Sequence, residues 1–164
     1  MNKFIQEVDA FCTGVDTELY EKQVNSKWTI KENLEHIYLS TNPVAKGLTL
    51  PKLTFLGFRS KNGSRSMERL TADYLALLEK GAKSTDKYVP AKNPSKLDKR
   101  ELLKKWNKLP GYFESGLAKW SEDQLDKYRV PHPLLGKLTF REMLYFTIHH
   151  IRHHLNSMKK VFEG

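Results

Sequence analysis

Four of the six histidines in this chain of 164 residues lie close together near the C-terminus. They are His149, His150, His153 and His154, in a stretch from Thr139 to Val161 that contains no Gly or Pro. The apolar residues of this stretch recur with helical spacing, which predicts one helix of about six turns. Imidazole nitrogens are common ligands of transition metals, so the first chemistry that this pattern suggests is metal binding.

A helical wheel separates the four histidines into two pairs. Steps of about 100° per residue place His154 within the apolar arc and His150 at its edge, one turn apart on the same face. His149 and His153 face the opposite, outer side. That outer side also carries Glu142, Tyr145 and Asn156. The spacing H-x-x-x-H lets both inward imidazoles reach one metal ion. A second interpretation stays open, in which His154 is a hydrogen-bonded core residue and the others lie on the surface.

A second histidine-bearing helix is expected to begin at Thr29. Thr29 and Glu32 have the spacing of a capping box, and apolar residues follow on one face of the predicted helix. His36 lies about 115° from the centre of that face, at the boundary between core and surface. Pro43 is expected to kink or end the helix. A lone histidine at such a boundary is more often a surface residue than a ligand.

The remaining patterns predict an all-α protein of one domain, residues 1–164. Further helices are expected over about residues 2–20 and 67–80 and after Asp98, the last of them kinked at Pro110. A long loop, residues 48–66, follows the second helix, and residues 128–137 form an extended piece with a turn at Gly136. The natural architecture is a four-helix bundle in which the helix of His36 packs against the helix of His150 and His154.

Composition limits the possible cellular location of the protein and the classes of partner that it could bind. Lys and Arg number 28 against 19 Asp and Glu, a net charge of +9, which suits an acidic small molecule or a nucleic acid. The basic residues are spread along the chain without an Arg-rich block, which argues against nucleic acid. There is neither an apolar run long enough to cross a membrane nor a signal peptide. The single cysteine, Cys12, excludes an intrachain disulfide, fits the cytoplasm and is expected to be a buried structural thiol.

Other catalytic motifs are absent from the sequence. It contains no Gly-rich phosphate loop, no G-x-S-x-G, no C-x-x-C and no H-E-x-x-H. The predicted helices also lack the several inward Glu residues of a di-iron bundle. A site made of three histidines is what remains.

Three fragments resemble the DinB-like superfamily, which includes the YfiT-type metal-dependent hydrolases. Trp28 to Ile37, W-T-I-K-E-N-L-E-H-I, is similar to the start of that family's second helix. His132 to Leu144, H-P-L-L-G-K-L-T-F-R-E-M-L, is similar to the lead-in to its last helix, and His150 to Leu155, H-I-R-H-H-L, to the family's H-x-x-H-H ending. The resemblance extends from Trp28 to Met158.

The resemblance implies a four-helix bundle with a metal held by one histidine of the second helix and two of the last. By position these are His36, His150 and His154. Three neutral imidazoles leave a coordination position open, as in a catalytic centre for Zn²⁺ or Ni²⁺. Characterised relatives include bacillithiol-using S-transferases and mycothiol-dependent isomerases. The family often has Gln where this chain has Ser157, which alters the expected surroundings of the site.

The implied activity is either metal-assisted hydrolysis of a small-molecule substrate or transfer involving an acidic low-molecular-weight thiol. The catalytic residues stay unknown; Tyr38, His149, His153 and Glu35 are candidates for a general base. A non-catalytic binding or stress-response module with a vestigial site is the alternative. A nucleic-acid binder, whose affinity would fall steeply with salt, is a third class. A homodimer is compatible with a bundle of this size.

Overall fold

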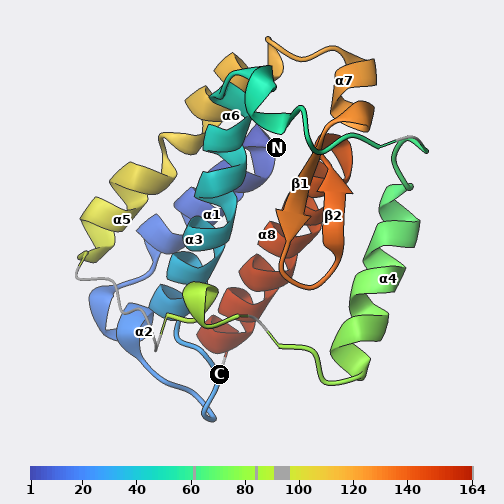
Figure 1. The fold of residues 1–164 in the computed structure, drawn as a ribbon. Coiled ribbons are helices and arrows are strands. Elements are labelled where there is room, and N and C mark those ends of the chain that lie inside the picture. Colours follow the sequence, from blue (N-terminus) through green and yellow to red (C-terminus); the bar gives the residue numbers. More distant parts are fainter. Residues whose placement is uncertain (61, 84, 91–96, 164) are drawn as a thin grey trace.

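Helices make up most of the protein, and a two-stranded hairpin precedes the last of them (Figure 1). The computed structural model describes residues 1–60, 62–83, 85–90 and 97–163. The α-helices are α1 (Asn2–Gly14), α2 (Thr17–Glu21), α3 (Ile30–Thr49), α4 (Met67–Glu79), α5 (Lys99–Trp106), α6 (Leu109–Leu117), α7 (Glu122–Lys127) and α8 (Phe140–Glu163). Two short 3₁₀ helices are η1 (Lys52–Phe55) and η2 (Asp86–Tyr88), and the strands are β1 (Arg129–His132) and β2 (Gly136–Thr139). The expectation of a mainly helical protein is confirmed.

Helices α3 and α8 pack against each other at the centre of the structure (Figure 1). Both begin at the predicted capping boxes. Thr29 Oγ1 accepts from Glu32 N at 3.0 Å, and Thr29 N donates to Glu32 Oε2 at 2.8 Å. The same two bonds join Thr139 and Glu142, at 3.1 and 2.9 Å. The caps fix where each helix starts, and therefore which residues of α3 and α8 face each other.

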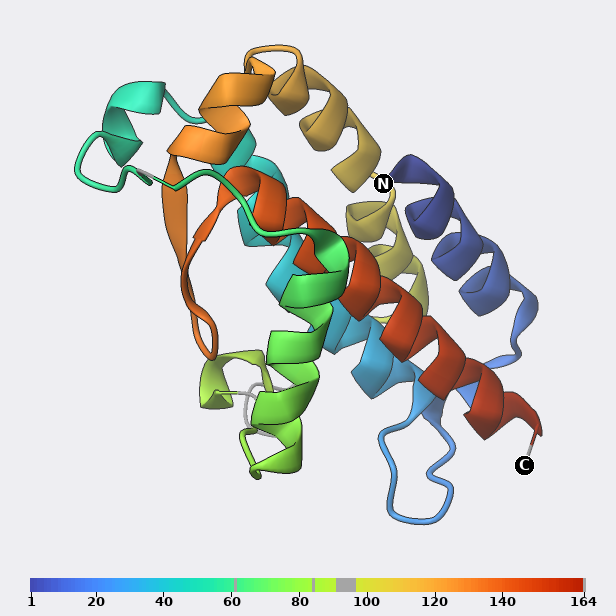
Figure 2. The same cartoon turned by 90° about the vertical axis from the view of Figure 1, so that its right-hand side faces the viewer.

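The other helices cover α3 and α8 from two sides. Helices α5 and α6 contact α3, and α1 contacts α5, α6 and α8, while α4 lies against α8 on another side (Figure 2). Buried apolar side chains of these helices form the main core. Cys12 belongs to it, with Sγ 4.0 Å from Met158 Sδ, and burial raises the pKa of its thiol to about 12. The predicted buried structural thiol is confirmed.

Pro43 is expected to kink or end this helix, but α3 continues through Pro43 to Thr49, so the helix does not end there. Proline removes one backbone hydrogen bond, but α3 is packed against both α6 and α8, and this packing holds it helical. Helix α6 approaches α3 closely at Gly116. A Cβ atom added to Gly116 would lie 2.6 Å from Leu48 Cβ and 3.2 Å from Leu48 C.

Gly116→Ala is therefore expected to destabilise the protein. The new methyl group would meet atoms that cannot swing away, and overpacking of this kind costs about 1–3 kcal/mol, or roughly 3–10 °C in melting temperature for a protein of this size. Gly111→Ala is the matched control, because it lies on the same helix with nothing within 4 Å of the added atom. Thermal unfolding of both variants tests the close approach, and equal melting temperatures would contradict it.

The first predicted helix, residues 2–20, is divided in two. Helix α1 ends at Gly14, Val15 is extended, and Asp16 caps α2 by accepting from Leu19 N at 2.7 Å. The Lys99 ammonium donates to the Val15 carbonyl oxygen. Glycine weakens the helix, and the aspartate offers a better helix start two residues later, which explains the break.

The extended piece predicted before the last helix is the antiparallel hairpin of β1 and β2, in register from Arg129 with Thr139 to His132 with Gly136. Gly136 has φ 73°, a conformation that glycine adopts without strain. The predicted loop after the second helix contains η1 and forms a β-bridge from Arg59 to Tyr128. Within the described part of the chain, no helix has both the length and the apolar content needed to span a membrane.

Candidate metal centre

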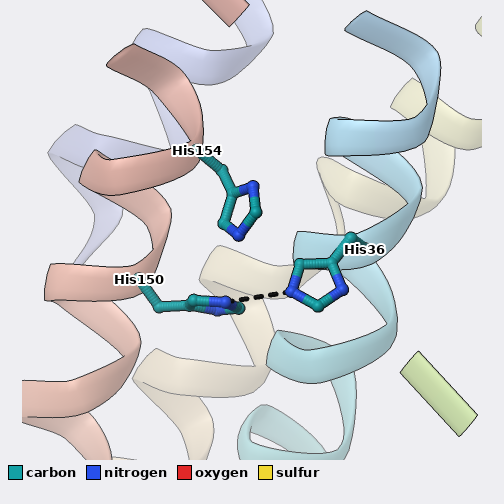
Figure 3. Close-up of side chains that lie close together, drawn as sticks. All are labelled: His36, His150 and His154. Atoms are coloured by element: carbon teal, nitrogen blue, oxygen red, sulfur yellow. Dashed lines mark hydrogen bonds between the residues drawn. The ribbon is translucent and has the colours of Figure 1, made fainter. Parts of the chain in front are cut away.

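The three histidines implied by the sequence meet between α3 and α8 (Figure 3). His36 extends from α3, and His150 and His154 extend from α8, one turn apart. One ring nitrogen from each lies within 4.8 Å of the others, and all three side chains are buried. Burial of His36 differs from its predicted boundary position, because η2 covers it: the carbonyl oxygen of Tyr88 lies 2.6 Å from His36 Nδ1.

Hydrogen bonds outside the cluster determine which nitrogen of His36 and His154 carries the proton. A carbonyl oxygen can only accept, so His36 Nδ1 must donate to Tyr88 O. His154 Nδ1 lies 2.8 Å from Asn33 Oδ1. The orientation of the Asn33 amide is fixed because its Nδ2 donates to the carbonyl oxygens of Trp28 and Thr29, at 3.1 and 2.8 Å. Both neutral rings therefore keep an unprotonated Nε2.

His150 completes the cluster. Its Nε2 forms a hydrogen bond of 3.0 Å with His36 Nε2 (Figure 3), and its Nδ1 lies 3.3 Å from Ser40 Oγ. Because His36 Nε2 is unprotonated, this bond requires the proton of His150 on Nε2. A metal bound at Nε2 would require that proton on Nδ1, where Ser40 Oγ can accept it because the Ser40 hydroxyl proton is directed to the carbonyl oxygens of His36 and Ile37. Two nitrogen ligands on a tetrahedral zinc ion lie about 3.3 Å apart, as follows from Zn–N distances near 2.05 Å. The donor set and its spacing thus fit a metal ion.

Burial also keeps the three rings in the form that binds metals. It lowers the pKa of His36, although the hydrogen bond to Tyr88 opposes this, and it lowers the pKa of His154 to about 2. Burial, followed by the charges of the neighbouring histidines, lowers the pKa of His150 well below its usual value. All three imidazoles are neutral near pH 7, so no imidazolium ion has to lose its extra proton before a metal binds.

Aromatic rings hold the imidazole planes in place. Trp28 stacks on His154 with ring centroids 5.9 Å apart and also contacts His36 at 4.9 Å. Phe146 stacks on His150 at 5.2 Å. Packing of this kind restricts rotation of each ring and preserves the direction of its Nε2 lone pair.

The outward side of α8 agrees with the wheel only in part. His153 is exposed, as predicted, but His149 is half-buried with its ring 6.1 Å from Tyr74. The prediction is wrong for Glu142, which is buried. Its Oε1 accepts from the backbone N and the Nε of Arg65, at 2.9 and 2.7 Å, because the segment before α4 covers this end of the helix.

A cavity of about 370 Å³ adjoins the cluster, and His36 and His150 form part of its wall. Its lining is mostly apolar and comes from α3, α8 and the hairpin, together with residues of η1, α4 and η2. Among the described residues that line it, none is Glu35, Tyr38, His149 or His153, the candidates for a general base. A substrate in this cavity would lie beside the histidines and away from those four side chains.

The sequence did not identify His132 as part of this wall. It is buried, its ring packs against Phe146 with centroids 4.2 Å apart, and burial lowers its pKa to about 4. Its Nδ1 accepts from the backbone N of Leu134 and Leu135, at 3.2 and 3.0 Å. The available signal was a histidine between two prolines, directly before the glycine turn of the hairpin.

Comparison with known proteins confirms the family resemblance seen in the sequence. A family model described as the DinB superfamily matches residues 3–158, a span that includes all three histidines. No curated protein and no solved structure matches the chain. The match covers nearly the whole length and includes both histidine-bearing helices, as the sequence resemblance implied. The chain belongs to the DinB superfamily.

Proposed function

We propose that this protein is a metal-dependent enzyme in which His36, His150 and His154 bind one divalent transition metal, Zn²⁺ or Ni²⁺. The observation that carries the proposal is the direction of the three rings: their Nδ1 atoms face hydrogen-bond partners outside the cluster, and their Nε2 atoms face one another, where one ion could bind all three. A structural histidine cluster would need no such orientation. The position of these three histidines beside a cavity supports a catalytic rather than a structural metal.

Each part of the chain has a distinct task in this proposal. A divalent metal held by three imidazoles would act as a Lewis acid and lower the pKa of a water or thiol that enters its open position. Asn33 and the Tyr88 carbonyl hold the protons of His154 and His36 on Nδ1. Trp28 and Phe146 fix the ring planes, and the cavity would position a small-molecule substrate.

Two reaction classes fit this centre: hydrolysis, and S-transfer that involves an acidic low-molecular-weight thiol. The net charge of +9 supports the thiol, and so does the cytoplasmic location that we expect. Product formation from a test substrate without thiol would identify the hydrolase. A strict requirement for added thiol would identify the transferase.

We assign the four arms of the bundle to α1, α3, the pair α5–α6 and α8. This assignment rests on the contacts that α5 and α6 make with α3, that α1 makes with α5 and α6, and that α3 and α1 make with α8. Helix α4 then lies outside the bundle against α8. The assignment treats residues 1–164 as one domain, with both histidine-bearing arms adjacent.

Elemental analysis tests the proposed metal directly. Protein produced without a histidine tag and purified without added metal is expected to contain about one equivalent of zinc or nickel, since the centre offers one set of three ligands. Chelation should remove the metal and lower the melting temperature. If the chain takes up neither zinc, nickel nor manganese, and if chelator leaves its melting unchanged, the non-catalytic binding or stress-response module is the better conclusion.

A further inference from the structure

A residue in the wall of the cavity beside the histidines has a buried hydroxyl group without a partner among the described residues. Thr41 lies in its wall and is 1% exposed, and its Oγ1 has no hydrogen-bond partner among the described residues. A buried hydroxyl without a partner is costly, and such groups in native proteins commonly mark a place where a ligand or an ordered water binds. Thr147, in the same wall, differs, because its Oγ1 donates to Met143 O at 2.7 Å.

A second polar group in the cavity wall is the ring of His132. Its Nδ1 accepts from two backbone N–H groups, so in the neutral ring the proton is on Nε2. The described part of the chain provides no hydrogen-bond acceptor for this Nε2–H. The hairpin therefore holds His132 as a hydrogen-bond donor in a wall that is otherwise mostly apolar.

The charge of the wall limits the ligand further. Of the described residues that line the cavity, Lys87 is the charged one, apart from the histidines. Its side chain is exposed, and its Nζ lies 5.5 Å from the centre of the Tyr88 ring. No carboxylate or guanidinium lines the described wall, so a charged ligand would lose its hydration without a buried counter-charge.

We propose that this cavity binds an uncharged, largely apolar small molecule through a carbonyl oxygen that accepts hydrogen bonds from Thr41 Oγ1 and His132 Nε2. Esters, amides and ketones have this chemistry. The inference rests on the proposed function, for which it specifies the class of substrate, and it assigns the apolar cavity to that compound rather than to the acidic thiol. Such a carbonyl compound would lie beside His36 and His150, which line the same cavity.

Acetophenone and benzoate form a suitable pair of probes, because both are small and aromatic and they differ in charge. Their binding can be measured by NMR titration with metal-free and metal-loaded protein. Acetophenone is expected to bind both forms with a dissociation constant of about a millimolar, as for other ligands of this size. Benzoate is expected to bind the metal-free form at least about tenfold more weakly. Equal or tighter binding of benzoate to that form would overturn the proposal.

Variants test the two hydrogen bonds. Thr41→Val keeps the shape of the side chain and is expected to weaken the binding of acetophenone about fivefold. A loss of that size corresponds to one ordinary hydrogen bond. It should leave the melting temperature of the free protein unchanged or higher, because the hydroxyl has no partner to lose. Thr147→Val, the matched control, should leave acetophenone affinity within about twofold. An acetophenone affinity that Thr41→Val does not change would overturn the role of Thr41.

His132→Asn tests the second donor. The Asn oxygen can accept from the backbone N–H two residues later, as Nδ1 does now, but the Nε2–H donor is lost. A loss of about fivefold in acetophenone affinity is expected, with circular dichroism unchanged.

Metal content measured on the same preparations separates the two proposals. If metal is bound and acetophenone is not, the cavity assignment fails alone; if acetophenone binds a protein that takes up no metal, the proposed function fails alone.

Discussion

Replacing His36, His150 or His154 singly by Ala is expected to reduce metal affinity by about 100-fold or more, because two imidazoles hold these metals poorly. The loss should also appear in thermal unfolding. A metal present at 100 times its dissociation constant stabilises the native state by about 2.7 kcal/mol, or roughly 5–10 °C for a protein of this size. That difference between metal-loaded and chelated protein should disappear in each variant.

The matched control for these variants is His149→Ala combined with His153→Ala. Both residues belong to the same helix and the same stretch of sequence, but their rings are not part of the cluster. Metal stoichiometry and the melting difference are expected to stay at wild-type values. A large loss of metal in the control would show that the ligand set is wrong. Retention of metal by all three single variants would show the same.

Glu142→Ala is expected to cost about 2–4 kcal/mol of stability, or roughly 6–12 °C in melting temperature, although the residue lies far from the histidines along α8. Glu142 is buried and accepts from the backbone N and the Nε of Arg65, and from Thr139 N. The substitution leaves a guanidinium and two backbone N–H groups without this acceptor. Thermal or denaturant unfolding near pH 7 measures the loss.

Glu122→Ala is the matched control for Glu142→Ala. Its carboxylate also pairs with an arginine, Arg141, at 2.6 Å, but the side chain is 80% exposed, so less than about 1 kcal/mol is expected. An equal effect of the two substitutions would contradict the assigned role of Glu142.

Acid should reduce the difference between wild type and Glu142→Ala. Burial raises the pKa of Glu142, but hydrogen bonds from Arg65 and Thr139 outweigh burial and bring the pKa below its usual 4.5. The stabilisation is therefore complete above pH 4.5 and is lost as the pH falls through the lower, folded-state pKa. A difference that grows in acid would contradict this assignment.

The sequence predicted what depends on neighbours along the chain. The capping boxes at Thr29 and Thr139 and the shared inward face of His150 and His154 follow from local hydrogen bonding and from 3.6-residue periodicity. These features placed His150 and His154 on the inward face of α8. The helices expected over residues 67–80 and 139–161 were also found within a few residues of the observed ends of α4 and α8.

What the sequence did not predict depends on segments that come from elsewhere in the chain. His36 is buried because η2 covers it, and Glu142 is buried because Arg65 reaches it from the segment before α4. His132 becomes a donor in the cavity wall only when the hairpin closes around its Nδ1. A wheel describes one helix in isolation and contains no information about such covering segments.

The amide of Asn33 has a consequence for protein design. Both of its hydrogens are taken by carbonyl oxygens at the start of α3, so its oxygen presents a lone pair to His154 in a fixed direction. Three histidines copied into another bundle would bring the nitrogen donors but not this control of their tautomers. A designer who transplants the centre would need to move the first turn of α3 as well, including Trp28, Thr29 and Asn33. The smallest portable unit that keeps the tautomer of His154 is therefore a helix start together with two turns of its partner helix, and the tautomer of His36 would also require the carbonyl of Tyr88.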